Sequence, residues 1–414
     1  MPQEPRGDRV RVALVCERYP PDPVCGGIGT YAHVLATGLA AAGHQVTVLA
    51  RTDRPPYTST VSGVEVRRLR ARSIPLPGPL HRRLERAQAL FEWALAVRGE
   101  VRSLARQARI DVVEAPEYLA QSVLVARRLP VVVKLHTPTY LCDRLNGSPA
   151  GNTSADNALG YRAERAAARR ATLVTSPSAA LLADVAADWG LDPAAAVVVP
   201  NPLDLDGYDR GPSARATDEI LYVGRLEPRK GVEVLAAAMA EVRLDHPAAV
   251  LRLVGGDVPL AGRGLMSEVI RDRVAGAGPG DGAPPVVHTD EVQRSALPAI
   301  YARAPIAAVP SIYENFPYTC LEAMAAGCAV VGSSTGGIPE IITDGVDGLL
   351  VPPGDPAALA VALDRLLGDA GLRARLGEAA RATVRRRFSV EAVTAATVDA
   401  YRLAGERHAG ATRS

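Results

Sequence analysis

Two cationic side chains follow a short apolar segment in the second half of the chain. The segment 220–223 runs directly into Gly224-Arg225-Leu226-Glu227-Pro228-Arg229-Lys230-Gly231. If this segment is a parallel strand, Arg225 and Lys230 lie in the turn at its carboxyl end, where open α/β sheets bind their ligands. Arginine can bind two phosphate oxygens at once and lysine acts as a point charge, so the pair suits a diphosphate. On these residues alone, a solvated turn is an equal alternative.

Two carboxylates with seven residues between them lie further along the chain. Glu314 and Glu322 bracket Asn315-Phe316-Pro317-Tyr318-Thr319-Cys320-Leu321. We expect Glu314 in a loop after a strand that ends at Val309, and Glu322 one turn into the helix that follows. The first amides of such a helix can bind phosphate, and a carboxylate beside them can accept hydrogen bonds from ribose hydroxyls. The two acids therefore strengthen the interpretation of a phosphate-binding site.

A glycine-rich segment in the first half allows two interpretations. Gly27-Ile28-Gly29-Thr30-Tyr31-Ala32 fits the dinucleotide-binding pattern, and Asp53 lies at a plausible distance downstream for a ribose hydroxyl. A true fingerprint turns directly out of the first strand, whereas here the proline-containing segment 17–25 intervenes, so an NAD-dependent oxidoreductase is not favoured. What remains is the pair Gly26-Gly27, which lets backbone approach a ligand closely at the start of a helix.

Parallel strands are needed to position these residues, and the sequence supplies two series of them. Short apolar runs alternate with segments of helical period, which indicates βαβ units. The first series of expected strands is 10–16, 45–50, 111–114, 131–136, 171–175 and 196–199, with helices at 28–42 and 155–170 among others. The second series is 219–223, 250–254, 286–288, 306–309 and 329–332. The chain is thus predicted to be an α/β protein with two doubly wound domains in tandem.

The boundary between the two domains is predicted from proline. Pro200-Asn201-Pro202-Leu203-Asp204 resists both helix and sheet, and the polar stretch 209–217 follows it. We therefore expect an N-terminal domain over 1–200 and a C-terminal domain over 201–387. The tail 370–387 is expected to be a charged helix. A last amphipathic helix, at about 388–405, is expected to pack back on the N-terminal domain.

Length, charge and cysteine content exclude several classes of protein. The chain has 414 residues and a net charge of +2, with 4% aromatic residues, which does not fit a dedicated nucleic-acid binder. The five cysteines form no CxxC pair, so we expect reduced thiols and a cytoplasmic protein. We find neither an apolar export segment at the start nor a run of about 18 uncharged apolar residues that could span a membrane.

On these motifs the sequence resembles the retaining glycosyltransferases of family 4, with those of aminoglycoside and natural-product pathways as one candidate group. The resemblance covers nearly the whole chain and is specific in GRLxxxKG and E-x7-E. It implies the GT-B fold, in which two Rossmann-like doubly wound domains face a central cleft. It also implies a nucleotide-sugar donor, with a UDP-sugar favoured, and transfer of a hexosyl or N-acetylhexosaminyl group.

The resemblance also implies a role for individual residues. Arg225 and Lys230 would hold the donor diphosphate, Glu322 the ribose, and Glu314 the donor sugar. His136, at the end of the expected strand 131–136, would lie beside the anomeric carbon. The remaining donor-binding positions would be backbone at Asn315, Phe316, Pro317 and Tyr318, and Gly26 and Gly27 from the opposite domain.

No metal or other cofactor is expected. Asp204-Leu205-Asp206 matches the DxD pattern of metal-dependent glycosyltransferases, but it falls in the linker and not at the phosphate turn. Arg225 and Lys230 already supply two positive charges. We favour attack on the same face as the leaving phosphate, which accepts the proton of the acceptor hydroxyl. In this scheme His136 acts as a hydrogen-bond partner and electrostatic stabiliser, and we favour this role over that of a base. The alternative is that His136 is a purely structural histidine at the end of a strand.

The acceptor is expected on the first domain. Glu17, Glu114, Glu117 and Asp143 fall in or near strand-end loops, which favours a cationic acceptor such as an aminocyclitol, although solvated loop acids are nearly as good an explanation. The long polar segment 140–160 suits a lid over that acceptor.

Two alternatives remain open. A cell-envelope glycan or glycolipid would be a different acceptor, with the arginine-rich segment 67–109 against a membrane surface. We favour a solvated helix face for that segment, because glutamates are interspersed in it. A GT-B protein without transferase activity, or a sugar-nucleotide epimerase, is the other alternative. The oligomeric state does not follow from the sequence.

Overall fold

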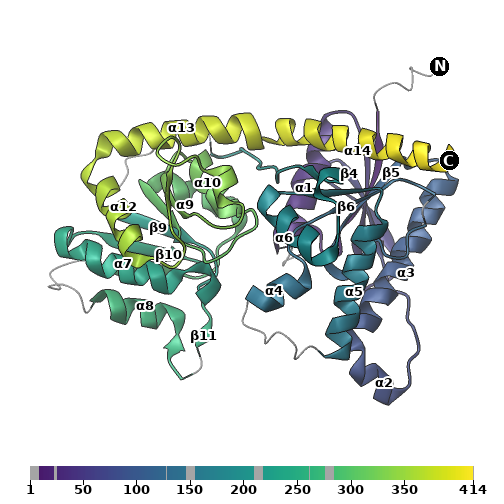
Figure 1. Cartoon of the computed structure of the whole chain (residues 1–414), viewed down its shortest axis with the longest axis horizontal. Helices are drawn as coiled ribbons and strands as arrows, with labels where there is room; N and C mark the ends of the chain where they lie inside the picture. The colour runs from purple at the N-terminus through teal and green to yellow at the C-terminus, as the bar shows by residue number, and fades with distance from the viewer. Residues whose placement is uncertain are drawn as a thin grey trace. The chain divides into compact units, whose positions relative to one another are not determined.

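The computed structural model describes residues 9–22, 26–126, 128–145, 154–208, 218–260, 262–275 and 284–413. Contacts divide the chain into two compact units: unit 1 is Met1–Pro202 with Val390–Ser414, and unit 2 is Leu203–Ser389. The sequence predicts boundaries after residues 200 and 387, and the contacts change units after 202 and 389. Each unit is described by itself below, and Figure 1 labels their elements.

Unit 1 is built on an eight-stranded sheet in the order β3-β4-β2-β1-β5-β6-β7-β8. All neighbours are parallel except β3 and β4, which form an antiparallel hairpin at one edge. The strand order reverses between β1 and β5, and in open α/β sheets this switch point is where ligands bind. The strands are β1 Arg11–Val15, β2 Gln45–Arg51, β3 Tyr57–Val61, β4 Val64–Leu69, β5 Val112–Pro116, β6 Val131–Lys134, β7 Leu173–Ser176 and β8 Val197–Val198.

Helices cover both faces of this sheet, which explains why its central strands β1, β5 and β6 are buried along nearly their whole length. One buried cluster joins the sheet to α1 and α14, and another joins it to α3 and α6. Ser154 and Ser178 cap α5 and α6 by accepting hydrogen bonds from backbone amides. The helices are α1 Gly26–Ala41, α2 Gly78–Arg83, α3 Glu85–Arg106, α4 Thr139–Leu145, α5 Ala155–Arg170, α6 Ala179–Trp189 and α14 Val390–Arg413.

The last helix, α14, belongs to unit 1 although unit 2 precedes it in the chain. It packs on α1 so closely that a Cβ added at Gly38 would lie 2.3 Å from Cγ1 of Val390. Val393 and Tyr401 are buried in the cluster that also contains the sheet. The expected packing of a C-terminal helix on the first domain is therefore present in the structure.

Unit 2 contains a six-stranded sheet in the order β13-β10-β9-β14-β15-β16, with parallel neighbours throughout. Its order reverses between β9 and β14, so the segments that follow these two strands line the switch point. The strands are β9 Glu219–Val223, β10 Val250–Val254, β13 Val286–Thr289, β14 Ile306–Val309, β15 Ala329–Ser333 and β16 Leu349–Val351. A short antiparallel pair, β11 Pro259–Leu260 and β12 Gly264–Leu265, follows β10.

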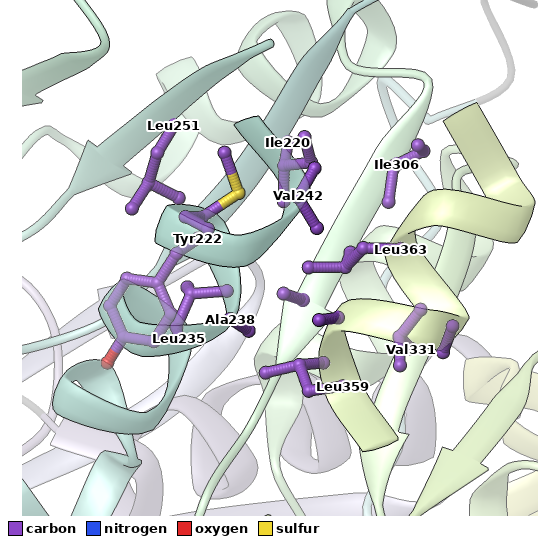
Figure 2. Close-up of a cluster of buried hydrophobic side chains, with 14 of the residues drawn as sticks. Ile220, Tyr222, Leu235, Ala238, Val242, Leu251, Ile306, Val331, Leu359 and Leu363 are labelled. Carbon is purple, nitrogen blue, oxygen red and sulfur yellow. The ribbon is translucent and has the colours of Figure 1, made fainter. Parts of the chain in front are cut away.

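Packing against this sheet holds the switch point in place. Figure 2 shows one cluster, in which strand residues such as Ile220 and Val331 meet Leu235 of α7 and Leu363 of α12. Burial of each such aliphatic side chain stabilises the fold by about 1.5–3 kcal/mol. The helices are α7 Val232–Asp245, α8 Met266–Ala275, α9 Leu297–Arg303, α10 Tyr318–Ala325, α11 Ile338–Ile341, α12 Pro356–Gly368 and α13 Ala370–Phe388.

Most expected elements are confirmed, and the differences are instructive. The expected strands 219–223, 250–254 and 306–309 and the helix 155–170 have the same bounds in the structure. The expected strand 131–136 is too long, because β6 ends at Lys134 and leaves His136 in the following loop. The hairpin of β3 and β4 was not expected. The whole segment 209–217 and part of the lid 140–160 lie outside the described residues. No described helix is both long and apolar enough to cross a membrane.

Candidate active site

The phosphate turn of unit 2 is shaped by glycines that bring the segments after β9, β10 and β14 together. Gly255 has φ of +143°, and a Cβ added there would lie 2.1 Å from the carbonyl oxygen of Gly224. Gly231 has φ of +69°, and its added Cβ would lie 1.9 Å from the carbonyl oxygen of Pro310. Only glycine allows this approach, which places the 3₁₀ turn Pro228–Lys230 against the loop that carries Glu314.

An ion triad occupies the turn. Nζ of Lys230 donates to Oε1 of Glu314, and Nη1 of Arg229 lies 3.2 Å from the same oxygen. Nη2 of Arg229 lies 2.8 Å from Oε1 of Glu227. The Glu314 side chain is 8% exposed, against 22% for Lys230, so the carboxylate is at the buried end of the triad. Lys230 and Glu314, which the sequence analysis placed in one site, are therefore in contact. The contact of Arg229 with Glu314 was not predicted.

Arg225 lies at the exposed side of the same turn. Its side chain is 67% exposed, and Nη2 lies 3.2 Å from Oε2 of Glu227. Its carbonyl oxygen accepts a hydrogen bond of 2.8 Å from the hydroxyl of buried Tyr222, which fixes the backbone. Glu227 thus contacts both arginines of the turn. A signal for this arrangement was present in the sequence, because Glu227 and Arg229 are part of the motif that contains Arg225 and Lys230.

The segment between the two carboxylates is anchored to the loop before α11. A Cβ added at Gly336, with φ of +52°, would lie 1.9 Å from the carbonyl oxygen of Glu314, and the Gly337 amide donates to that oxygen at 2.9 Å. Phe316 is buried edge-on against Phe388, with ring centroids 5.6 Å apart. Helix α10 then starts at Tyr318, directly after Pro317. Its first turn therefore has a fixed position beside the ion triad.

Glu322 lies in α10, one turn from its start, as expected. It is buried, and its Oε1 accepts a hydrogen bond of 2.6 Å from Nη2 of Arg294. The guanidinium of Arg294 also lies 5.1 Å from the ring centroid of Tyr318. Burial raises the pKa of Glu322, and the positive charge of Arg294 opposes that rise. The pairing with Arg294 spans distant segments and was missed from the sequence.

In unit 1, His136 follows β6 and is held by its backbone. Its amide donates to both carboxylate oxygens of Glu117, at 2.9 and 2.8 Å. The imidazole contacts the ring of Tyr31 edge-on, with centroids 5.1 Å apart. Burial, and secondarily the charge of Lys134, lowers the pKa of His136 to about 3. The imidazole is therefore neutral near pH 7, so a hydrogen-bonding role fits it and stabilisation by a positive charge does not.

Glu117 forms part of a buried pair of carboxyl groups with Glu164. Burial, together with the nearby charge of Glu164, raises the pKa of Glu117 to about 8. Glu164 accepts hydrogen bonds from the amides of Leu119 and Thr139, both at 3.0 Å. The two acids thus fix the loops that follow β5 and β6. Leu119 has an unusual φ of 58° in the first of these loops.

Glu114 links three elements of unit 1. Its carboxylate accepts hydrogen bonds of 2.9 Å from the hydroxyls of Tyr31 in α1 and Tyr401 in α14. Burial raises the pKa of Glu114, and the charge of Lys134 opposes that rise. Lys134 is itself buried and donates to the carbonyl oxygen of Val199, and burial lowers its pKa to about 7.

The four acids expected to bind the acceptor have different surroundings. Glu114 was expected as the last residue of a strand, and the structure places it two residues before the end of β5, where it is buried. Glu117, after β5, is buried too. Neither presents a carboxylate at the surface. Glu17 pairs with Arg51 at 2.8 Å, and Asp143 accepts a hydrogen bond of 2.5 Å from Tyr161. The acceptor role therefore stays a prediction for Glu17 and Asp143 alone.

Two further expected features can be located. Gly26 and Gly27 are exposed at the start of α1, and a Cβ added at either would meet no atom within 4 Å. Asp204, of the DxD pattern, accepts a hydrogen bond of 3.0 Å from the amide of Asp206. Among the residues that the structure describes, no cluster of three or more His, Cys, Asp or Glu side chains is arranged to hold a metal ion.

Two doubly wound domains in one chain, each with polar residues at its strand switch point, are the components of the GT-B fold of glycosyltransferases. Residues 26–202 match the family described as "Glycosyl transferase 4-like domain", and residues 211–383 match "Glycosyl transferases group 1". A solved sucrose-phosphate synthase from Thermosynechococcus elongatus superposes with a TM-score of 0.71 at 25% identity. The match covers 95% of this chain and 98% of that one, which agrees with the expected GT-B fold.

Curated relatives agree with this assignment over their whole length. A glycogen synthase from Mycobacterium tuberculosis is 30% identical, over 96% of each chain. A D-inositol 3-phosphate glycosyltransferase from Acidothermus cellulolyticus is 31% identical, over 97% of this chain and 92% of its own. The chain therefore belongs to the group 1 glycosyltransferases, the family 4 type that its sequence resembles.

Proposed function

We propose that the protein transfers a hexosyl or N-acetylhexosaminyl group from a nucleotide sugar, with a UDP-sugar favoured, to an acceptor hydroxyl. The observation that carries the proposal is the ion triad of Lys230, Arg229 and Glu314 at the switch point of unit 2, with exposed Arg225 beside it. Such a cluster of cations at the carboxyl end of a parallel strand suits a diphosphate.

In the proposed complex each part of unit 2 contacts one part of the donor. Arg225 and Lys230 bind the diphosphate, together with the backbone from Asn315 to Tyr318 at the start of α10. Glu322 binds the ribose, and Glu314 the sugar. The buried carboxylate of Glu322 suits the ribose hydroxyls as ligands, because its two oxygens can each accept more than one hydrogen bond. Arg294, which now donates to Oε1, would either remain there beside a hydroxyl or move away from it.

In the proposed reaction the acceptor hydroxyl attacks the anomeric carbon on the face that the diphosphate leaves, so configuration is retained. The C–O bond to the β-phosphate breaks, the new glycosidic bond forms, and the leaving phosphate takes the hydroxyl proton. Preorganised cations at that phosphate are the main source of catalysis, and one such donor typically contributes about 3–4 kcal/mol. Neutral His136 contributes a hydrogen bond near the sugar.

We further propose that turnover needs no metal ion. The support is that Arg225, which is exposed, and Lys230, which is partly exposed, can themselves balance the charge of a diphosphate. The Asp204-Leu205-Asp206 segment lies before β9 and not in this turn.

For the acceptor we propose a cyclitol, with an aminocyclitol of an antibiotic pathway as the first choice. Support comes from the relative whose name gives D-inositol 3-phosphate, a cyclitol, as its substrate. The relative named glycogen synthase supports a glycan acceptor as the alternative. Gly26 and Gly27 would allow either acceptor to approach the start of α1.

The test is release of nucleoside diphosphate from UDP-, GDP-, ADP- and dTDP-sugars in EDTA, with inositol phosphates, aminocyclitols, oligosaccharides or anionic vesicles added. We expect one donor and one acceptor class to stimulate release, and NMR of the product to show retained anomeric configuration. Release that stops in EDTA and returns with Mg²⁺ would overturn metal independence. An absence of both release and nucleotide binding would overturn the donor assignment.

A further inference from the structure

Glu314 receives two cations at one oxygen, although one cation would balance its charge. Lys230 and Arg229 both contact Oε1, and the carboxylate is nearly buried. The inference that follows rests on the proposed function, in which Lys230 binds the donor diphosphate. Lys230 cannot remain paired with Glu314 and also direct its full charge at the phosphates, so donor binding must weaken the existing ion pair.

Loss of Lys230 as a partner would be costly if Glu314 had no other. Removing one partner from a buried ion pair leaves an uncompensated charge, which is strongly unfavourable. Lys230 would then be retained by Glu314, and diphosphate binding would be weak. A second cation that stays in contact with Glu314 avoids this penalty.

Arg229 is positioned to be that second cation, because it is fixed from three sides. Nη2 pairs with Glu227 at 2.8 Å, and Nη1 donates to the carbonyl oxygen of Tyr313 at 3.2 Å. Its own carbonyl oxygen accepts a hydrogen bond of 2.9 Å from the amide of Ile312. A guanidinium held in this way remains with Glu314 when the flexible Lys230 side chain turns away.

We propose that Arg229 is a positioning residue that keeps the charge of Glu314 balanced while Lys230 transfers from Glu314 to the donor diphosphate. Arg229 does not itself contact the donor in this scheme. Glu227 has the supporting role, since it holds Arg229 and Arg225 at the same time.

The test is a double-mutant cycle on nucleotide binding, measured by titration calorimetry with UDP, GDP, ADP and dTDP. Nucleotides without sugar are used because Glu314 is assigned to the sugar. Arg229→Gln should weaken binding of the preferred nucleotide by about tenfold. In a Glu314→Gln background the same substitution should change binding by less than about twofold, because no buried charge remains to be balanced.

Two controls separate this role from a structural one. Arg229→Lys retains the charge and should recover most of the lost affinity. Arg252→Gln breaks an ion pair of 2.9 Å with Glu219 in the same sheet and should leave nucleotide binding unchanged.

The possible failures are distinguishable. If the wild-type protein binds none of the four nucleotides, the proposed function is wrong. If it binds one and Arg229→Gln has the same effect in the wild-type and Glu314→Gln backgrounds, the inference about Arg229 is wrong. Should Glu314→Gln fail to fold, wild-type affinity in Arg229→Gln, or equal losses in Arg229→Gln and Arg229→Lys, would overturn the inference in the same way.

Discussion

The sequence contains only two lysines, Lys230 in unit 2 and Lys134 in unit 1, and their surroundings are opposite. Lys230 is partly exposed and paired with a carboxylate in a cluster of formal charges. Lys134 is buried and donates to a backbone carbonyl, beside the ring of Tyr31. The same contrast holds for the acids, since Glu314 is paired with cations and Glu117 with a backbone amide.

This difference indicates how each switch point works. An ion pair costs little to exchange when its carboxylate keeps a second cation, as Glu314 keeps Arg229, because no charge is left unbalanced when Lys230 leaves. Buried carboxyl groups bound to amides and hydroxyls cannot be exchanged without leaving those groups unsatisfied. Unit 2 is thus suited to exchanging its partners for a charged ligand. Unit 1 is suited to holding a neutral imidazole in one position.

The largest expected effect comes from removing the exchangeable cation. Lys230→Ala should lower kcat/KM for the donor by at least about 100-fold, because a preorganised charge at the leaving phosphate is lost. The measurement is steady-state release of nucleoside diphosphate under the conditions that give wild-type turnover. Turnover of Lys230→Ala close to that of the wild type would contradict the assignment of Lys230 to the diphosphate site. It would also contradict the functional contrast drawn between the two lysines.

A smaller effect is expected from chemical labelling, which compares both lysines in one molecule. An amine-reactive ester should label Lys230 at least about tenfold faster than Lys134, because burial keeps the reagent away from Lys134 even though its lowered pKa leaves more of that amine neutral. Saturation with the preferred nucleoside diphosphate should slow labelling of Lys230 alone. Peptide mass spectrometry measures both rates, and equal labelling of the two residues would contradict the description of unit 1.

The smallest effect concerns stability and pH. The pKa of Glu117 is raised to about 8 by burial, so the folded protein keeps a proton that the unfolded chain loses above its ordinary pKa. The contribution of this group to stability should therefore fall as pH rises between about 5 and 7, by up to about 1.4 kcal/mol per pH unit. His136 contributes a slope of the opposite sign below its ordinary pKa, because burial lowers its pKa to about 3, so the effect of Glu117 is read from the difference between wild type and variant. Glu117→Gln should reduce that slope, although Glu114 and Glu164 retain slopes of the same sign.

Urea unfolding at pH 5, 6 and 7 measures this slope. Trp93 and Trp189, the two tryptophans of the sequence, are both buried in unit 1, so intrinsic fluorescence follows that unit. Glu85→Gln, at the exposed start of α3, is the matched control and should leave the slope unchanged. An unaltered slope in Glu117→Gln would mean that Glu117 is ionised in the folded protein.

The sequence was sufficient for most central strands of the two sheets and for the local part of the site. Apolar runs identify β9 and β14, and the motif around Lys230 lies within one turn, so its residues had to be neighbours. The E-x7-E spacing likewise places Glu322 in the first turns of α10 whatever surrounds it. These predictions depend on the chain within about ten residues.

Pairings between distant segments could not be predicted in the same way. Arg229 meets Glu314, and Arg294 meets Glu322, only because the sheet brings different loops to one edge. Glu114 was expected at the end of the strand 111–114, in or near a loop, whereas it lies inside β5 and is buried. Its burial is compensated by hydrogen bonds from the hydroxyls of Tyr31 in α1 and Tyr401 in α14, and the residues next to Glu114 in the sequence do not predict these contacts.

The place of α14 in unit 1 has a consequence for how the protein is made. Because a ribosome adds residues from the N-terminus, all of unit 2 is synthesised before α14 exists. Until α14 is released, the α1 face of the unit 1 sheet and the carboxylate of Glu114 lack a partner that they have in the finished protein. Unit 2, as an uninterrupted stretch, can complete its folding first. Chains truncated before α14 should therefore lose structure in unit 1, although unit 1 is the part that is synthesised first.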